Sequence, residues 1–281
     1  MPELPEVESI RQDLDREVIG RTIQAARVLD TKNARRVIRR YERREDFEDQ
    51  LKGVEILSTE RRGKYLLLML ANQTALVIHL GMSGQIVLAG RDDPWAPHTH
   101  VVFDFADGGQ LRYIDPRTFG EVFVADRSDL GEIAELNKLG LDPLTGSISW
   151  EEFSRKLRLK KTKLKSLLMD QRFISGIGNI YSDEILFAAG LRYDRSSASL
   201  TGEEQLRLYD AIHEILHRAV RARGTSMKDE QYRDLYGSLG GFQDLLKVYQ
   251  REGQPCVRCG SIIQRARWTN RSTHFCPGCQ V

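Results

Sequence analysis

The chain has 281 residues, of which 41% are hydrophobic and 29% charged, and its formal net charge is +2. These values are typical of a globular protein with one large core and a smaller one. No apolar run reaches the about 20 residues of a membrane-spanning helix, and the acidic start MPELPEVES is unlike a signal peptide. The composition therefore argues against a membrane or secreted protein, and we expect a cytoplasmic location.

The charge is unevenly distributed along the chain. Residues 151–281 carry 22 basic and 15 acidic side chains, a net +7, whereas the first 150 residues carry a net −5. A basic C-terminal half is typical of proteins that bind a polyanion, although a solvated surface explains a modest imbalance equally well.

The first half predicts one helix followed by short strands. Val7, Ile10, Leu14 and Val18 recur at helical spacing, and Gly20 ends the pattern. From position 23 to about 124, β-branched and aromatic residues alternate between turn signals, and Arg91–His100 is predicted to be a loop. The predicted strands include Lys64–Leu70, Thr74–Leu80, Val101–Phe105, Gln110–Tyr113 and Glu121–Val124. This pattern predicts an antiparallel β-sandwich with a flanking helix.

The second half changes character. Residues 150–222 show helical spacing, residues 224–243 are polar and Gly-rich and predict a mobile loop, and the tail from Leu245 alternates weakly. We therefore predict an α+β chain with segments 1–135, 150–243 and 245–281.

All four cysteines lie near the C-terminal end of the chain. Cys256, Cys259, Cys276 and Cys279 form two CxxC pairs. This spacing is typical of structural zinc and unlike the scattered cysteines of a disulfide framework. We predict one structural Zn²⁺ on a β-hairpin.

The N-terminus offers a nucleophile. Removal of Met1 exposes the secondary amine of Pro2, and an α-amino group titrates near 7.7–8.0, so a fraction of it is nucleophilic at neutral pH. Attack on a sugar C1′ would give an iminium, with Glu3 and Glu6 as candidate proton carriers. These residues alone favour the simpler interpretation of an arbitrary acidic start.

Several motifs together change that interpretation. They are MPELPEVE at the start, RRGKYL at 61–66, HLGMSG at 79–84, DPRTFG at 115–120, GIGNIY at 176–181 and the closing CxxC pairs. In this order they resemble the formamidopyrimidine-DNA glycosylase and endonuclease VIII family over essentially the whole chain. The resemblance implies a catalytic β-sandwich, a helix-two-turn-helix segment with a lesion-capping loop, and a zinc-finger hairpin.

The resemblance also implies catalytic roles. Pro2 is similar to the family's Schiff-base nucleophile, and Glu3 to the acid that helps to open the deoxyribose and release the base. Lys64, on a predicted strand, is similar to a lysine assigned to phosphate contact and to proton transfer in β-elimination. Arg271 corresponds to the zinc-finger arginine that grips the phosphates flanking the lesion and assists δ-elimination.

Further residues resemble the family's DNA contacts. Met82, Arg117 and Phe119 are similar to the trio that enters the minor groove of a duplex whose damaged base is flipped out. The alternative for Met82 and Phe119, a place in the sandwich core, is disfavoured by their turn-like segments.

A basic segment precedes GIGNIY. Residues 155–165, with Lys160 among them, hold seven basic side chains in eleven. The turn with Gly178 and Asn179 is expected to present backbone amides to a phosphate. His79 and His98 are weaker candidates, because a single histidine is more often structural.

The family implies a bacterial bifunctional glycosylase and lyase that acts as a monomer on double-stranded DNA with oxidised bases or abasic sites. The pattern of Met82, Arg117 and Phe119 is similar to the branch of the family that removes oxidised purines (8-oxoguanine and formamidopyrimidines). The resemblance implies that β,δ-elimination follows base release. One stretch, residues 232–242, departs from that branch's capping loop. The alternatives are an endonuclease VIII-like enzyme for oxidised pyrimidines and a catalytically silent damaged-DNA-binding relative.

Overall fold

The computed structural model describes residues 2–31, 33–144, 148–227 and 231–281. The chain divides into two compact units: unit 1 is Met1–Asn137 with Ala222–Gly241, and unit 2 is Lys138–Arg221 with Phe242–Val281. Unit 1 thus contains residues 222–241, which the sequence analysis assigned to the middle segment.

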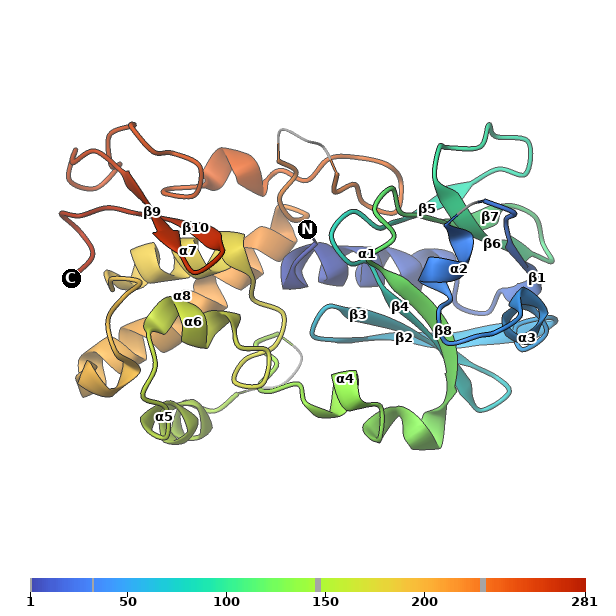
Figure 1. Cartoon of the computed structure of the whole chain (residues 1–281), viewed down its shortest axis with the longest axis horizontal. Helices are drawn as coiled ribbons and strands as arrows, with labels where there is room; N and C mark the ends of the chain where they lie inside the picture. Colours follow the sequence, from blue (N-terminus) through green and yellow to red (C-terminus); the bar gives the residue numbers. More distant parts are fainter. Residues whose placement is uncertain (1, 32, 145–147, 228–230) are drawn as a thin grey trace. The chain divides into compact units, whose positions relative to one another are not determined.

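Within the described residues, unit 1 is built on an antiparallel sheet of eight strands in the order β5-β7-β6-β1-β2-β3-β4-β8 (Figure 1). The strands are β1 (Thr22–Val28), β2 (Val54–Arg62), β3 (Tyr65–Leu70), β4 (Thr74–His79), β5 (Gln85–Ala89), β6 (Thr99–Phe105), β7 (Gln110–Ile114) and β8 (Glu121–Asp126). The β1–β2 register is short, with Thr22 opposite Glu55 and Ile23 opposite Val54. This junction divides the sheet into two halves, and both contribute side chains to one buried core, as a β-sandwich requires.

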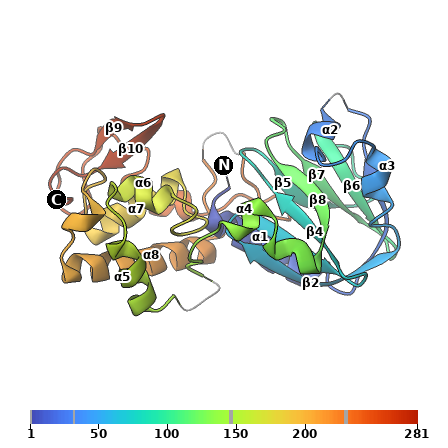
Figure 2. The same ribbon diagram turned by 60° about the horizontal axis from the view of Figure 1, so that its bottom comes forward.

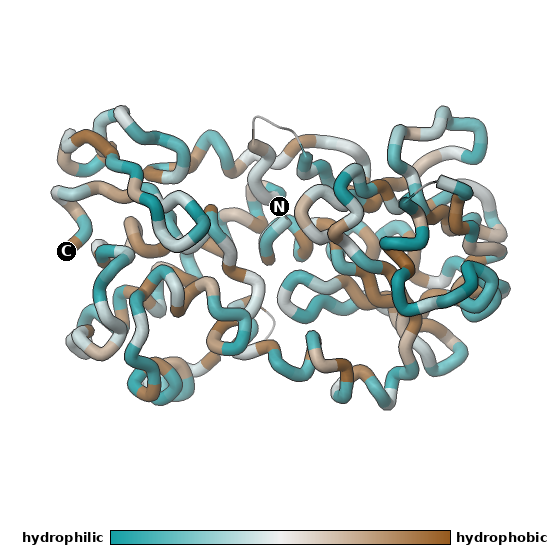
Figure 3. Tube along the Cα trace, viewed as in Figure 1, coloured by the Kyte–Doolittle hydropathy of each residue, from teal (hydrophilic) through white to brown (hydrophobic). Residues whose placement is uncertain are grey.

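The first helix is as predicted. Helix α1 (Leu4–Glu17) lies against β2 and β3, and Val7, Ile10, Leu14 and Val18 are fully buried in the sandwich core. Figure 3 shows that hydrophobic residues are also concentrated along the strands of this unit. The predicted strands of this unit are also present, with ends shifted by one or two residues.

Two short helices interrupt the region that was predicted to hold only strands. Helices α2 (Ala34–Val37) and α3 (Arg44–Glu48) each bury an apolar side chain, Val37 and Phe47. Single turns of this length are too short to show a helical period in the sequence. Unit 1 also holds the 3₁₀ helix η1 (Arg127–Gly131) and helix α4 (Ala134–Asn137).

Unit 2 has the predicted helical character and ends in the predicted hairpin (Figure 2). Its elements are α5 (Trp150–Arg158), α6 (Leu164–Met169), α7 (Asn179–Ala189), η2 (Ser197–Ser199), α8 (Gly202–Arg221), η3 (Phe242–Leu245), β9 (Gln264–Trp268) and β10 (Arg271–Phe275). Helix α7 is buried on nearly all sides, and it packs against α6, α8 and β10. In the described part of the chain, no helix combines the length and apolarity needed to cross a membrane.

The stretch 224–243 is predicted to be a mobile loop, and its described residues up to Gly241 form no helix or strand, but they pack closely against the rest of unit 1. Tyr232 and Leu235 belong to the sandwich core, and the Leu88 amide donates to the Leu235 carbonyl at 2.9 Å. The polar and glycine residues of this loop form compact turns around the buried Asp234. Residues 228–230 of this prediction lie outside the described residues.

Candidate active site

Pro2, Glu3 and Glu6 lie close together and are buried at the N-terminal end of α1. Glu3 is the N-cap of α1, and it forms a reciprocal capping box with Glu6. The Glu3 amide donates to Oε2 of Glu6 at 2.8 Å. Pro2 and Glu3 are both buried. Pro2 therefore lies beside two acidic side chains.

Two residues from much later in the chain, Gly224 and Thr225, contact Glu6. The Thr225 amide donates to Oε1 of Glu6 at 2.7 Å. The preceding Gly224 has a φ of +78°, and a Cβ there would lie 2.8 Å from the Glu6 side chain. Only glycine allows the chain to approach Glu6 so closely. No local sequence pattern connects Thr225 with Glu6, because 219 positions separate them.

Lys64 lies in the turn between β2 and β3, not on a strand as predicted, because β3 begins at Tyr65. Arg61 fixes this hairpin to α1. Its Nε donates to Oε2 of Glu8 at 2.9 Å, and its Nη1 donates to the Gly63 carbonyl at 3.0 Å. Arg61 and Glu8 are buried. Arg61 belongs to the RRGKYL motif, but nothing in the sequence predicted its contact with Glu8.

The three residues expected in the minor groove lie on two adjoining turns. Met82 is 37% exposed and Phe119 is 53% exposed, so the alternative of a core position is wrong for both. Arg117 is also exposed, and its guanidinium lies 4.9 Å from the centre of the Phe119 ring.

A buried carboxylate joins these turns. Asp115 accepts hydrogen bonds from the Ser83 hydroxyl at 2.7 Å, from the Gly120 amide at 2.8 Å and from the Arg117 amide at 3.2 Å. At Gly81, a Cβ would lie 2.5 Å from the Gly120 nitrogen, so the two turns touch through their backbones. Asp115 therefore presents the exposed trio on one rigid surface.

The two histidines differ in their surroundings. Burial and, to a smaller extent, the nearby charge of Lys64 lower the pKa of His79 from 6.5 to about 4, so His79 is neutral at pH 7. Its ring lies 4.5 Å from that of Tyr65. His98 is exposed in the loop before β6, with a φ of +64°.

The basic segment of unit 2 is only partly available to a ligand. Arg155, Arg158, Lys161 and Lys163 are exposed and Lys160 is half-buried. Lys165 is fully buried, and its Nζ lies 2.5 Å from Oδ1 of Asp183. Lys165 therefore holds α6 to α7 and does not extend the surface patch.

The turn before α7 carries the other predicted contacts. Gly178 is the N-cap of α7 and Asn179 is its first residue. The Asn179 Nδ2 donates to the Tyr249 hydroxyl at 3.4 Å. The Glu184 carboxylate in turn accepts the amides of residues 247–249 at 2.8–2.9 Å, and burial raises the pKa of Glu184. Tyr249 is thus a candidate site residue that the sequence analysis did not identify.

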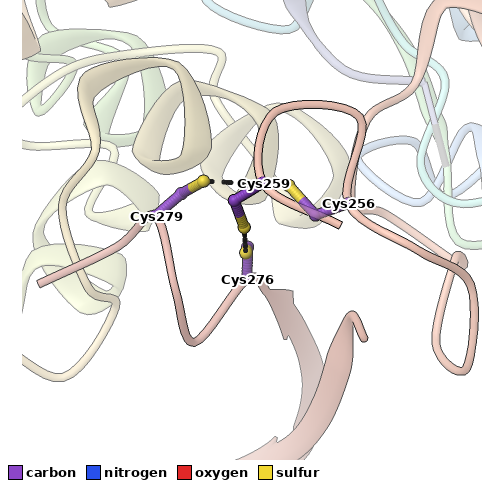
Figure 4. A group of neighbouring side chains, drawn as sticks. All are labelled: Cys256, Cys259, Cys276 and Cys279. Carbon is purple, nitrogen blue, oxygen red and sulfur yellow. Dashed lines mark hydrogen bonds between the residues drawn. The ribbon is translucent and has the colours of Figure 1, made fainter. Parts of the chain in front are cut away.

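The four cysteines converge as a tetrahedral zinc site requires (Figure 4). Their Sγ atoms all lie within 4.8 Å of one another, with Cys256 and Cys279 3.8 Å apart and Cys259 and Cys276 3.4 Å apart. Zinc–sulfur bonds of about 2.3 Å in a tetrahedron place the sulfurs about 3.8 Å apart. The cluster therefore fits one structural zinc ion, and four thiolates leave no coordination position open for catalysis.

The hairpin places Arg271 beside its tip. Arg271 is exposed at the start of β10, opposite Trp268 of β9. Asp183 of α7 holds this strand, because it accepts the Thr273 hydroxyl at 2.7 Å and the His274 amide at 2.9 Å. Arg271 therefore belongs to unit 2, whereas Pro2, Glu3 and Lys64 belong to unit 1.

Three family descriptions match successive parts of the chain. Residues 1–122 match the formamidopyrimidine-DNA glycosylase N-terminal domain, residues 139–231 its H2TH domain, and residues 253–281 a zinc finger found in FPG and IleRS. The formamidopyrimidine-DNA glycosylase of Heliobacterium modesticaldum is 44% identical over 283 residues, with all of both chains covered. This chain belongs to the formamidopyrimidine-DNA glycosylase family.

Solved structures agree with this assignment. The Lactococcus lactis Fpg complex with DNA containing an abasic site aligns with a TM-score of 0.89 and 34% identity, covering 99% of each chain. A variant of the same protein with Fapy-dG-containing DNA aligns with a TM-score of 0.90, with the same identity and coverage.

The Arg61–Glu8 pair allows a direct test of how the Lys64 turn is held. Arg61→Ala leaves the buried Glu8 carboxylate without one of its cations, so we expect a loss of about 3 kcal/mol in the free energy of unfolding. Arg62→Ala is the matched control, because the Arg62 Nη2 pairs with Oε2 of Glu60 at the surface, 4.0 Å away. This substitution should lower the free energy of unfolding by at most about 0.5 kcal/mol. Urea unfolding measures both, and equal losses would contradict the structural role of Arg61.

Loss of the zinc site should weaken DNA binding without destabilising the β-sandwich. Cys276→Ser should abolish stoichiometric zinc and weaken DNA binding, because a small metal-dependent module loses its fold without the ion. Elemental analysis and duplex affinity measure these effects, and the unfolding of the sandwich should be nearly unchanged. Freshly purified parent protein without zinc would refute the assignment.

Proposed function

We propose that this protein is a bifunctional DNA glycosylase and lyase that removes oxidised purines from double-stranded DNA. The observation that carries the proposal is Pro2 buried beside Glu3 and Glu6 at the N-terminal end of α1. The family membership and the DNA complexes of the Lactococcus lactis protein support it.

The reaction starts at the amine. The neutral nitrogen of Pro2 attacks C1′ of the damaged nucleotide, and the C1′–base bond breaks as the base leaves with a proton. Glu3 protonates the ring oxygen while the C1′–O4′ bond opens, which leaves an iminium between Pro2 and C1′. The iminium of a secondary amine has no N–H proton to lose, so its positive charge is permanent and it is an effective electron sink.

Strand cleavage follows from the iminium. Removal of a C2′ proton expels the 3′ phosphate in β-elimination, and a second elimination expels the 5′ phosphate. Lys64 contacts a phosphate and transfers a proton in the first elimination, and Arg271 binds the phosphates that flank the lesion. Water then hydrolyses the iminium and regenerates the Pro2 amine.

Several described surfaces suit a duplex with a flipped nucleotide. Met82 fills the vacated space, Phe119 wedges the base step, and Arg117 hydrogen-bonds the orphaned cytosine. Lys160, Gly178 and Asn179 contact the phosphate backbone, as do the neutral His79 and the exposed His98. The zinc finger holds Arg271 on a rigid hairpin.

The substrate class rests on the relatives and on the exposed trio. The curated relative carries the name formamidopyrimidine-DNA glycosylase, and the Lactococcus lactis protein is seen with Fapy-dG-containing DNA. We infer that the protein acts as a monomer in the cytoplasm, where a bacterial genome lies.

A blocked N-terminus tests the proposal. Insertion of Ala between Met1 and Pro2 turns the proline nitrogen into an amide, whose lone pair is delocalised into the carbonyl. The variant should bind an abasic-site duplex like the parent yet lose base excision, strand nicking and borohydride trapping. Both proteins are assayed on duplexes that each carry one 8-oxoguanine, one formamidopyrimidine or one oxidised pyrimidine.

The outcomes separate the alternatives. The parent should cleave the two purine substrates faster than the oxidised pyrimidine, and mass spectrometry must show Pro2 as its first residue. A parent that binds every duplex and cleaves none is a silent binding protein, and faster cleavage of the pyrimidine contradicts the purine assignment.

A further inference from the structure

A cluster of two buried aspartates and the partly exposed Arg223 lies along the body of α1, away from its N-terminal end. The Arg223 guanidinium donates to Asp234 at 2.6 and 3.0 Å and to Asp13 at 3.1 Å, with a further bond to the second Asp13 oxygen. Asp13 and Asp234 are both buried. The hydrogen bonds that Arg223 donates to Asp13 and Asp234 raise the pKa of Arg223, so its charge is permanent.

Asp234 organises the chain that follows it. Its Oδ1 accepts the Ser238 amide at 2.8 Å and the Tyr236 amide at 3.0 Å, which closes a tight turn. The next residue, Leu235, is fully buried in the sandwich core. The Tyr236 hydroxyl donates to Glu17 at the end of α1. The turn is therefore a fixed anchor that Arg223 connects to α1.

Arg223 and Thr225 grip α1 at two points. Arg223 bonds Asp13, and the Thr225 amide bonds Glu6. Asp13 follows Glu6 by seven positions, which is close to two helical turns and about 10 Å, so both carboxylates face the same side of the helix. The short segment 223–225 thus spans α1 from its middle to its N-terminal end.

The backbone at Arg223 is held in an unfavourable conformation. Its φ is +59°, a left-handed value that a residue with a long side chain seldom adopts. Such a conformation costs free energy and persists only where surrounding contacts impose it. Here the two carboxylates, together with the bond from the Tyr232 hydroxyl to the Arg223 carbonyl at 3.0 Å, supply those contacts.

We propose that Arg223 is a positioning residue for the reaction at Pro2: by clamping Asp13 and Asp234 it holds the Thr225 amide on Glu6, and Glu6 holds the Glu3 amide next to the nucleophile. This inference rests on the proposed function. Arg223 touches no reacting atom, and it acts through the segment 223–225 and the end of α1.

The experiment compares Arg223→Gln with two matched variants. Arg223→Lys keeps a cation for the two carboxylates. Arg16→Ala removes a different arginine that bonds the same Asp13 at 2.5 Å but is 62% exposed. The rate is that of borohydride-trappable adduct formed in a single turnover on an abasic-site duplex, which requires no recognition of a damaged base. Duplex affinity and thermal unfolding are measured alongside.

We expect the loss of the Arg223 contacts to displace Pro2 from its reactive position. Arg223→Gln should slow adduct formation by about tenfold or more at unchanged duplex affinity, since small displacements of reacting groups are costly. Arg223→Lys should recover most of the rate, and Arg16→Ala should match the parent. Hydrogen exchange should rise in Arg223→Gln in peptides that cover residues 3–9 and 222–227.

The outcomes distinguish this inference from the proposed function. A parent that forms no adduct refutes the proposed function, and the exchange of the two peptides then still tests the clamp. A Gln variant that reacts within about twofold of the parent, or that leaves both peptides unchanged, overturns the positioning role. Should Arg223→Gln fail to fold, Asp234→Asn replaces it, because the amide keeps an acceptor for the turn and removes the charge opposite Arg223.

Discussion

The carboxylate of Glu6 is the constraint on which the candidate active site depends. It accepts the amides of Glu3 and Thr225 with its two oxygens, at 2.8 and 2.7 Å. One side chain thereby fixes the start of α1 and a segment more than two hundred residues later. Hydrogen bonds to a carboxylate at a helix N-terminus are favourable because they are charge-assisted and aligned with the helix dipole.

Buried carboxylates that accept backbone amides also hold three other segments that carry candidate contacts. Asp115 holds the turns that present Met82 and Arg117, and Glu184 holds the chain at Tyr249. Asp183 holds β10, which carries Arg271. Each is buried, and each accepts at least one backbone amide. Buried carboxylates that are satisfied by amides are stable only in one geometry, so they give loops the rigidity that positioned chemistry requires.

Local patterns predicted most of the fold and the metal site. The spacing of Val7, Ile10 and Leu14 marks α1, alternation marks the strands, and two CxxC pairs mark the zinc cluster. The motifs also led to the family and to the candidate residues at Pro2 and Glu3. These features depend on residues that are close in sequence, so they can be predicted without a structure.

The features that were missed depend on partners that are distant in sequence. The loop predicted over 224–243 gave no sign of its packing, because nothing local shows that Asp234 contacts Arg223 or that Leu235 reaches the core. Likewise, nothing near Arg61 indicates Glu8, and nothing near Glu184 indicates Tyr249. Lys64 was misplaced onto a strand because Gly63 and Lys64 form a tight hairpin turn that strand propensity does not reveal.

The most direct test of the account is to locate the covalent bond. The parent protein is incubated with an abasic-site duplex, reduced with borohydride and digested, and the peptide that carries the sugar remnant is sequenced by mass spectrometry. The account predicts a modified N-terminal peptide with the added mass on the nitrogen of Pro2. A remnant on Lys64 or on any other lysine, with Pro2 unmodified, would contradict it.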